Sequence, residues 1–93
     1  MEILEDTVVR RDEEVVFAGW GDEGVMLNVE TGSYHALSDV GTRIWQLLEA
    51  PHSATALTQE LVEEFDVDAE VCRAAVIDFV RALADRRLVH VAG

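Results

Sequence analysis

Apolar and polar residues alternate in the first half of the chain in the way that is typical of β-strands. A β-prone run covers residues 15–20, and every second side chain from Val25 to Val29 is aliphatic, a period of two that predicts a strand. Gly32 can take a positive φ at little cost, which suits a turn, and Ser33–Leu37 forms a third predicted strand. Because the connections are this short, we expect an antiparallel three-stranded meander.

The second half of the chain has the longer period of amphipathic helices. Ser38, Ser53 and Asp68 each stand where a helix N-cap is expected, Pro51 ends the first helix, and the third runs to about Arg86. The predicted core stripes have three- and four-residue spacing: Val40, Ile44, Leu47 and Leu48 in the first helix, Leu57, Leu61 and Phe65 in the second, and Cys72, Val76, Phe79 and Leu83 in the third, with Val80 at its border.

These elements predict an α+β fold, a three-stranded antiparallel sheet followed by three helices, whose helical half resembles a winged helix-turn-helix. The short apolar tail at residues 88–91 is a candidate terminal strand. Residues 1–13 are rich in acids, and we expect them to be either loose or a short strand at residues 7–9. Residues 14–93 then form the one domain that this length allows.

The charge balance argues against nucleic-acid binding. The formal net charge is −12, and the seven basic residues, all arginines, are dispersed along the chain. Such a protein repels a phosphate backbone. A winged-helix DNA-binding regulator remains an alternative on helix order alone, but the second helix carries Gln59, Glu60, Glu63 and Glu64 where a DNA-reading helix usually carries Arg or Lys.

The compartment follows from cysteine usage and hydropathy. A single cysteine, Cys72, cannot form an internal disulfide, which fits a reducing environment. The opening residues are acidic where a signal peptide needs bases, and no apolar run approaches the roughly 20 residues of a membrane span. We therefore expect a cytoplasmic protein without membrane contact.

Catalytic chemistry has little support in the sequence. Cys72 lies on an apolar stripe, as structural cysteines do, and His35, His52 and His90 are far apart without metal-ligand spacing. No serine stands in a nucleophile elbow and no glycine pattern matches a phosphate loop. We expect no enzyme activity, no metal and no cofactor. Trp20 and Trp45 are the large apolar residues expected to be incompletely buried, and packing is the favoured role for both.

An extended peptide is the ligand that the predicted elements would suit. Ser33–Leu37 is a candidate edge strand, and beside the core stripe of the third helix runs a flank of small or apolar residues, Val71, Ala75 and Ala82, with Asp78 further out. An edge strand next to an apolar helix face can hold an added strand. The alternative is that this flank packs on the domain's own strands. Both can hold, because residues that pack on the strands can also form the floor of a peptide-binding groove.

A family resemblance covers about residues 15 to 91 and rests on particular residues within that stretch. They are Val25 to Asn28, Glu30-Thr31-Gly32, Tyr34, Leu37, Val40-Gly41, Arg43-Ile44-Trp45, Leu47-Leu48, Leu61, Phe65-Asp66-Val67-Asp68, Val76, Phe79, Leu83 and Leu88-Val89. With these residues the chain resembles the PqqD-like family, the recognition elements of pathways that modify ribosomally made peptides. Within that family it is most similar to the stand-alone members of lasso-peptide clusters.

The resemblance implies that a precursor's leader peptide pairs with Ser33–Leu37 and lies against the third helix. The implied contacts are Tyr34, His35, Ala36 and Leu37 from the strand, and Val71, Ala75, Asp78 and Phe79 from the helix. It also implies presentation of the precursor to a separate leader peptidase and an ATP-dependent macrolactam-forming cyclase. The alternative role is that of a PqqD-type chaperone for a radical-based peptide modifier.

Two positions depart from the family pattern. Relatives often carry an acid four residues before the helix phenylalanine, where this chain has Ala75, and Asp78 is the candidate replacement. Relatives also often have glycine just before the final Leu-Val, where this chain has Arg87.

Overall fold

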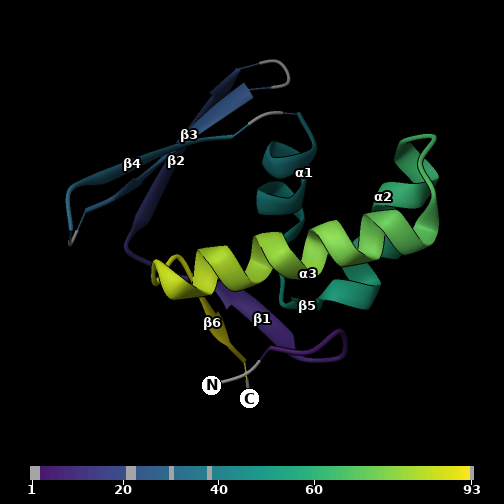
Figure 1. Ribbon diagram of the computed structural model, residues 1–93. Coiled ribbons are helices and arrows are strands. Elements are labelled where there is room, and N and C mark those ends of the chain that lie inside the picture. The colour runs from purple at the N-terminus through teal and green to yellow at the C-terminus, as the bar shows by residue number, and fades with distance from the viewer. Residues whose placement is uncertain (1–2, 21–22, 30, 38, 93) are drawn as a thin grey trace.

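Six strands and three helices make up the computed structural model, which describes residues 3–20, 23–29, 31–37 and 39–92. In chain order they are β1 (Val8–Arg11), β2 (Val15–Trp20), β3 (Glu23–Asn28), β4 (Ser33–Leu37), α1 (Asp39–Leu47), β5 (His52–Ser53), α2 (Ala54–Glu64), α3 (Ala69–Asp85) and β6 (Val89–Val91). The predicted α+β fold is confirmed. In Figure 1, α3 crosses between a sheet of β2, β3 and β4 and the strands β1 and β6.

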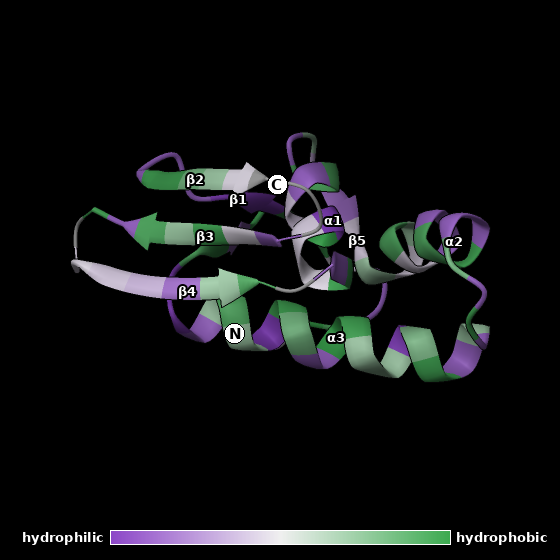
Figure 2. Ribbon diagram, turned by 90° about the horizontal axis from the view of Figure 1, so that it is seen from above, coloured by the Kyte–Doolittle hydropathy of each residue, from purple (hydrophilic) through white to green (hydrophobic). Residues whose placement is uncertain are grey.

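The predicted meander is the sheet β2-β3-β4, antiparallel throughout, and its strands lie side by side in Figure 2. Its inner face carries Met26 and Leu37, which are buried in the core. Val25 and Leu27 lie on the other face and are only half-buried. The alternation therefore predicted the strand correctly, although the aliphatic Val25 and Leu27 do not form its buried side.

A second small sheet has the order β5-β1-β6, with β1 in the middle. The acidic N-terminal segment thus contains a strand, and Val9 at its centre is 0% exposed. The apolar tail is also a strand, because Val9 and Arg11 lie opposite Val91 and Val89. The two-residue strand β5, which the sequence pattern did not predict, pairs with the other edge of β1.

Helix capping follows the predicted pattern where the structure describes it. The Ser53 hydroxyl accepts a hydrogen bond from the Ala56 amide at 3.1 Å. The Asp68 carboxylate accepts two bonds, each 3.0 Å, from the first turn of α3. Both are N-cap interactions that satisfy otherwise unpaired amides. Ser38, the third predicted cap, lies outside the described residues.

The end of α3 explains one departure from the family pattern. The amides of Arg87 and Leu88 bond to the carbonyls of Ala84 and Leu83 at 3.0 and 2.9 Å, which is the hydrogen-bond pattern of a Schellman motif. Arg87 has φ of 60°. This left-handed conformation suits glycine better than arginine, so the position at which relatives have glycine keeps the glycine conformation here.

The core corrects two expectations about side chains. Trp45 is only 1% exposed, so the expectation that it would be incompletely buried was wrong. Trp45 belongs to the hydrophobic core, and Arg11 of β1 also covers it: the guanidinium lies 5.0 Å from the Trp45 ring centroid, and its Nε donates to the Trp45 carbonyl at 2.8 Å. Val80, predicted at the border of the α3 stripe, is buried with Val76 and Leu83. The side chain of Trp20 lies outside the described residues.

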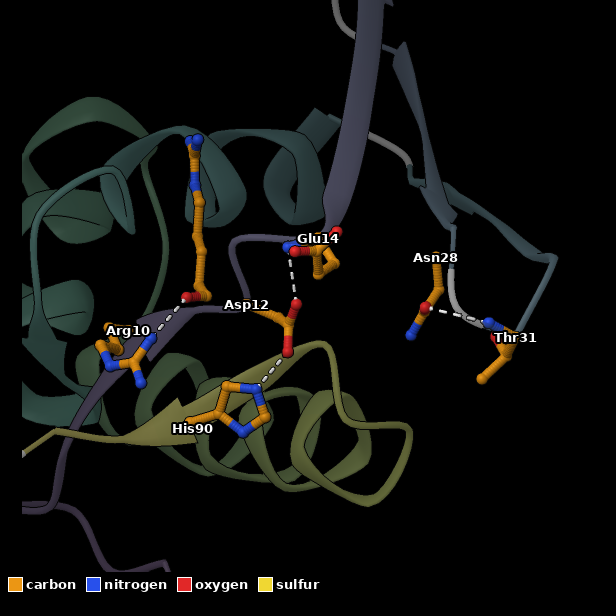
Figure 3. A network of polar contacts seen from close by, with 7 residues as sticks. Arg10, Asp12, Glu14, Asn28, Thr31 and His90 are labelled. Carbon is orange, nitrogen blue, oxygen red and sulfur yellow. Dashed lines mark hydrogen bonds and ion pairs between the residues drawn. The ribbon is translucent and has the colours of Figure 1, made fainter.

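One acidic side chain ties the two sheets together. Asp12, between β1 and β2, accepts a hydrogen bond from the Glu14 amide at 2.7 Å, and its other carboxylate oxygen contacts the ring of His90 on β6 (Figure 3). Two hydrogen bonds lower the pKa of Asp12: the bond with His90 has the larger effect and the bond from the Glu14 amide the smaller one. The turn into β2 is therefore fixed to β6.

Candidate functional site: an open strand edge beside an apolar groove

The strand β4 has one open edge. In the described part of the chain, β4 pairs with β3, and the sheet order β2-β3-β4 places it at the margin. An edge strand presents unpaired amides and carbonyls to any chain that can lie alongside it. The candidate edge strand of the sequence is therefore an edge strand in the structure.

The phase of the hydrogen-bond ladder shows which residues face outward. The Val29 amide donates to the Glu14 carbonyl at 3.5 Å, and residues 14 and 29 are opposite one another if the β2–β3 register is extended by one pair. Hydrogen-bonded pairs alternate with non-hydrogen-bonded pairs in an antiparallel ladder. In β3, the amides and carbonyls of Val25 and Leu27 therefore point to β2. The amide and carbonyl of Met26 point to β4.

The same alternation continues into β4. His35 lies opposite Met26, so its amide and carbonyl point to β3. Tyr34 and Ala36 lie opposite Leu27 and Val25, so their amides and carbonyls point to the open edge. Two donors and two acceptors are thus available there to an added strand.

An apolar groove of about 430 Å³ runs beside this edge. Its walls come from the end of β4, from α1, from the end of α2 with the link that follows it, and from residues 71–79 of α3. The lining residues are all apolar: Ala36, Leu37, Val40, Gly41, Ile44, Leu61, Phe65, Val67, Val71, Cys72, Ala75, Val76 and Phe79. At its rim, Val67 and Val71 are 43% and 71% exposed, which leaves apolar surface ready for a partner.

The floor of the groove depends on a close approach of three elements. A Cβ atom added at Gly41 of α1 would lie 3.4 Å from the ring of Phe79 on α3 and 3.5 Å from Leu37 on β4. These are ordinary van der Waals distances, so the three elements meet at Gly41 and still leave room for a methyl group there. Phe79, placed by the sequence in the core stripe and also among the contacts, is half-buried and lines the groove.

Five of the eight residues singled out from sequence line the groove: Ala36, Leu37, Val71, Ala75 and Phe79. Tyr34 is 73% exposed on the outer face of the sheet. His35 is half-buried in a shallow depression shared with residues 85–87. Asp78 is exposed on α3, one turn beyond Ala75. These three do not line the groove, although the backbone of Tyr34 faces the same open edge.

Several groove residues were assigned from sequence only to the core or to a link. Phe65 and Val67 belong to the segment between α2 and α3, and Ile44, Leu61 and Val76 belong to predicted core stripes. One sequence signal could have placed Phe65 and Val67 in the groove: they are apolar residues in a short, otherwise acidic link before the Asp68 cap. Apolar residues in such a link need something to cover them.

The chemistry of the groove is that of a binding surface. Burial raises the pKa of the Cys72 thiol, which keeps it protonated and a weak nucleophile. Within the described ranges, no three His, Cys, Asp or Glu side chains gather where they could hold a metal ion. No helix in those ranges is long and apolar enough to cross a membrane. Open backbone groups beside an apolar trough can hold an extended peptide.

Comparisons with known proteins place the chain in a family. The family described as "Coenzyme PQQ synthesis protein D (PqqD)" matches residues 23–89. No curated protein sequence matches at a significant level.

Three solved structures share the fold. The structure of TbiB1 in complex with the TbiA(beta) leader peptide is 34% identical, with a TM-score of 0.81, over 90% of this chain and 98% of that one. Lasso peptide synthetase B1 complexed with the leader peptide is 25% identical, with a TM-score of 0.75, over 88% of this chain and 96% of that one. The PqqD truncation of Methylobacterium extorquens PqqCD, described as a stand-alone RiPP recognition element, is 19% identical, with a TM-score of 0.79, over 96% of this chain and 95% of that one. From the extent of the family match and the identity to TbiB1, this chain belongs to the PqqD family.

Proposed function

We propose that this chain is a non-catalytic recognition protein that binds the leader segment of a ribosomally made precursor peptide. The observation that carries the proposal is the apolar groove directly beside the open edge of β4. Support also comes from the two similar proteins whose solved structures are complexes with a leader peptide.

Binding would proceed by strand addition. The amides and carbonyls of Tyr34 and Ala36 would pair with the leader backbone and set its register. Side chains alternate across a strand, so every second leader residue would point into the groove. An aromatic and an aliphatic anchor would suit this trough, since full burial of each contributes about 1.5–3 kcal/mol.

The result of binding would be proximity rather than chemistry. A held leader raises the effective concentration of the attached core peptide at the processing enzymes. We assign these enzymes as a leader peptidase and a macrolactam-forming cyclase in the cytoplasm. The lasso role is favoured over that of a chaperone for a radical enzyme, because lasso peptide synthetase B1 is 25% identical to this chain and the PqqD structure is 19% identical.

Nucleic acid is a poor alternative ligand. The exposed residues of α2 include Gln59, Glu60, Glu63 and Glu64. A helix with this surface would repel the phosphates of a DNA groove.

The proposal is tested by titrating a labelled leader peptide from the precursor gene of the same cluster, with a scrambled peptide as control. We expect saturable binding of micromolar strength or tighter, about −8 kcal/mol or better, and none for the scrambled peptide. Failure of well-folded protein to bind, with the partner enzyme either absent or present, would overturn the recognition role.

A matched pair of variants locates the binding site. Ala75 and Ala74 are neighbouring exposed alanines on α3, but only Ala75 lines the groove. Ala75→Trp would fill the trough and should weaken leader binding at least tenfold, while Ala74→Trp should leave it within about twofold of the wild type. Equal affinity of the two variants would move the leader away from this groove.

Asp78 has a separate test. It is exposed one turn beyond Ala75 and would contribute a polar contact at the groove rim. Asp78→Lys should weaken the leader complex severalfold, whereas the same charge change at Asp85, which is also exposed but further along α3, should not. Unchanged affinity of the Asp78 variant would remove this residue from the site.

A further inference from the structure

The shallow depression at His35 is a polar hollow of about 310 Å³ between the first half of β4 and the end of α3. It is lined by Thr31, Ser33, His35, Asp85, Arg86 and Arg87, and we call it the arginine hollow. Two arginines beside one acid give it a positive charge, on a chain whose formal net charge is −12. A local excess of this sign attracts an anion that the rest of the surface repels.

Within the described ranges, the two guanidinium groups of the arginine hollow have no partner. Arg86 and Arg87 are both exposed, and no hydrogen bond or ion pair joins either side chain to another described residue. The other five arginines each bind a carbonyl or carboxylate of the chain: Arg10, Arg11, Arg43, Arg73 and Arg81. A guanidinium presents its donors in a planar fork that fits a carboxylate. The hollow therefore offers donors and positive charge to a ligand that carries a carboxylate.

The backbone of Arg87 is strained. Arg87 has φ of 60°, a left-handed conformation that glycine adopts without the steric cost that a side chain brings. Glycine at this position would make the same turn at the end of α3 with less strain. Strained backbone of this kind is found at binding sites, where the surrounding structure holds it in place. The strain points to a role for the arginine side chain outside the turn.

The arginine hollow and the apolar groove are the two ends of one gap between β4 and α3. Residues of both elements line both ends, and β4 runs alongside α3 in Figure 2. The residues on the side of α3 that joins the two ends have three- and four-residue spacing and are Val71, Ala75, Asp78, Ala82 and Asp85. From Ala75 to Asp85 the helix rises about 15 Å, and from Leu37 to Ser33 the strand spans about 13 Å. A strand added along β4 therefore passes the groove at one end and the arginine hollow at the other.

We propose that the arginine hollow binds an Asp or Glu side chain of the leader peptide. This inference rests on the proposed function and adds a second anchor to the apolar one. Residues opposite one another on paired strands point to the same face of the sheet. A leader side chain opposite Leu37 therefore enters the apolar groove, while one opposite His35 or Ser33 faces the arginine hollow. Because every second residue shares a face, the leader should carry its acid about two or four residues from an apolar anchor.

A carboxylate in the arginine hollow would fix the register of the added strand. The hydrogen-bond pattern and the side-chain faces of a strand both repeat every two residues, so a leader can shift by two and keep both. A shift of this size moves the acid by about 7 Å. One direction takes it toward the groove, beside which Asp66, Asp68 and Glu70 are exposed. Opposite charges at the two ends of the gap therefore favour one register.

Exchange of single arginines tests the proposal with the labelled leader of the same cluster. Arg86→Gln removes one cation from the hollow and should weaken leader binding about threefold, since an exposed ion pair contributes modestly. Arg87→Gly should weaken it as much, although its melting temperature should equal or exceed that of the wild type, because glycine relieves the strain. Arg10→Gln makes the same charge change as Arg86→Gln on an exposed arginine of β1 and should leave the affinity unchanged.

A second set of titrations uses leaders in which each Asp or Glu is replaced by Asn or Gln, one at a time. One such peptide should bind the wild type about threefold more weakly. The same peptide should bind Arg86→Gln with no further loss, which is the non-additivity expected of two groups in contact. The replaced residue should lie about two or four positions from an apolar anchor. Asp85→Asn removes the competing carboxylate and should tighten binding of the unmodified leader.

Different results would overturn the proposal and the function on which it rests. The arginine hollow is not an acid site if Arg86→Gln binds the leader as tightly as the wild type, if Arg10→Gln loses as much affinity, or if the losses are additive for every leader acid. Failure of the wild type to bind the unmodified leader would refute the proposed function itself. Since that titration comes first, the two failures are distinguishable.

Discussion

Proline at position 36 should weaken leader binding strongly while leaving the fold intact. Ala36 directs its amide to the open edge of β4, so a proline there removes a donor that an added strand would use and that the sheet itself does not use. Proline is tolerated on an edge strand when the missing N–H faces solvent. The two effects, on binding and on folding, are therefore separable at this residue.

The magnitude follows from the hydrogen bond that is lost. The leader carbonyl that would accept from Ala36 stays unpaired in a partly dry interface, which costs about 1–3 kcal/mol. Taking about 2 kcal/mol, and about 1.4 kcal/mol for each tenfold change, the dissociation constant should rise about 30-fold. The free energy of unfolding should change by no more than about 1 kcal/mol, since no ladder bond is broken.

Two control variants check this reasoning. Ala36→Val keeps the amide and should retain most of the affinity. His35→Pro removes an amide that points to Met26, so it should destabilise the fold by about 3 kcal/mol or more. Fluorescence anisotropy with labelled leader gives the affinities, and thermal unfolding gives the stabilities. A folded Ala36→Pro protein that binds as tightly as the wild type would refute strand addition at this edge.

Three further predictions concern the scaffold. The Arg87→Gly variant should be more stable than Arg87→Ala by about 1 kcal/mol, or about 4–8 °C in Tm. Both substitutions remove the charge, but only glycine adopts the left-handed conformation without strain. Equal melting temperatures of the two variants would contradict this. Asp12→Asn should cost about 1 kcal/mol at pH 7. The hydrogen bond with His90 lowers the folded-state pKa of Asp12, so this stability is present above the unfolded value of about 3.9 and is lost as the pH falls through the folded pKa. The wild type and Asp12→Asn should therefore have nearly the same free energy of unfolding below about pH 4. A difference that stays constant in urea unfolding from pH 7 to pH 3 would contradict this role of Asp12. Arg11→Lys should destabilise by about 1–2 kcal/mol in urea unfolding, because lysine cannot both stack flat on Trp45 and fork onto its carbonyl; an unchanged midpoint would show that the stacking contributes little.

The local features of the fold were readable from sequence because each has a local cause. The alternation at residues 25–28 falls within β3, Gly32 has φ of 73° in the turn, and Asp68 caps the helix that follows it. The long-range features had no such signal. β5 contains only two residues and pairs with β1 more than 40 positions earlier. Trp45 packs in the core and is also covered by Arg11, 34 residues away.

The site shows the same division. The small flank on α3 and the edge strand predicted an apolar groove beside β4, and Ala75 and Ala36 line that groove. The pattern did not show that the aliphatic Val25 and Leu27 face outward. A period of two tells which residues share a face of the strand, but not which face is buried. It also did not show the phase of the β4 ladder, which turns the backbone amide and carbonyl of Tyr34, and not those of His35, to the open edge.

Amide hydrogen exchange, followed residue by residue with and without the leader, is the most direct test of strand addition. In the free protein, the amides of Tyr34 and Ala36 should exchange rapidly, while those of His35 and Leu37 should be protected by β3. Saturating leader should slow the exchange of Tyr34 and Ala36 at least a hundredfold. A leader that binds tightly yet leaves these two amides in fast exchange would contradict the account.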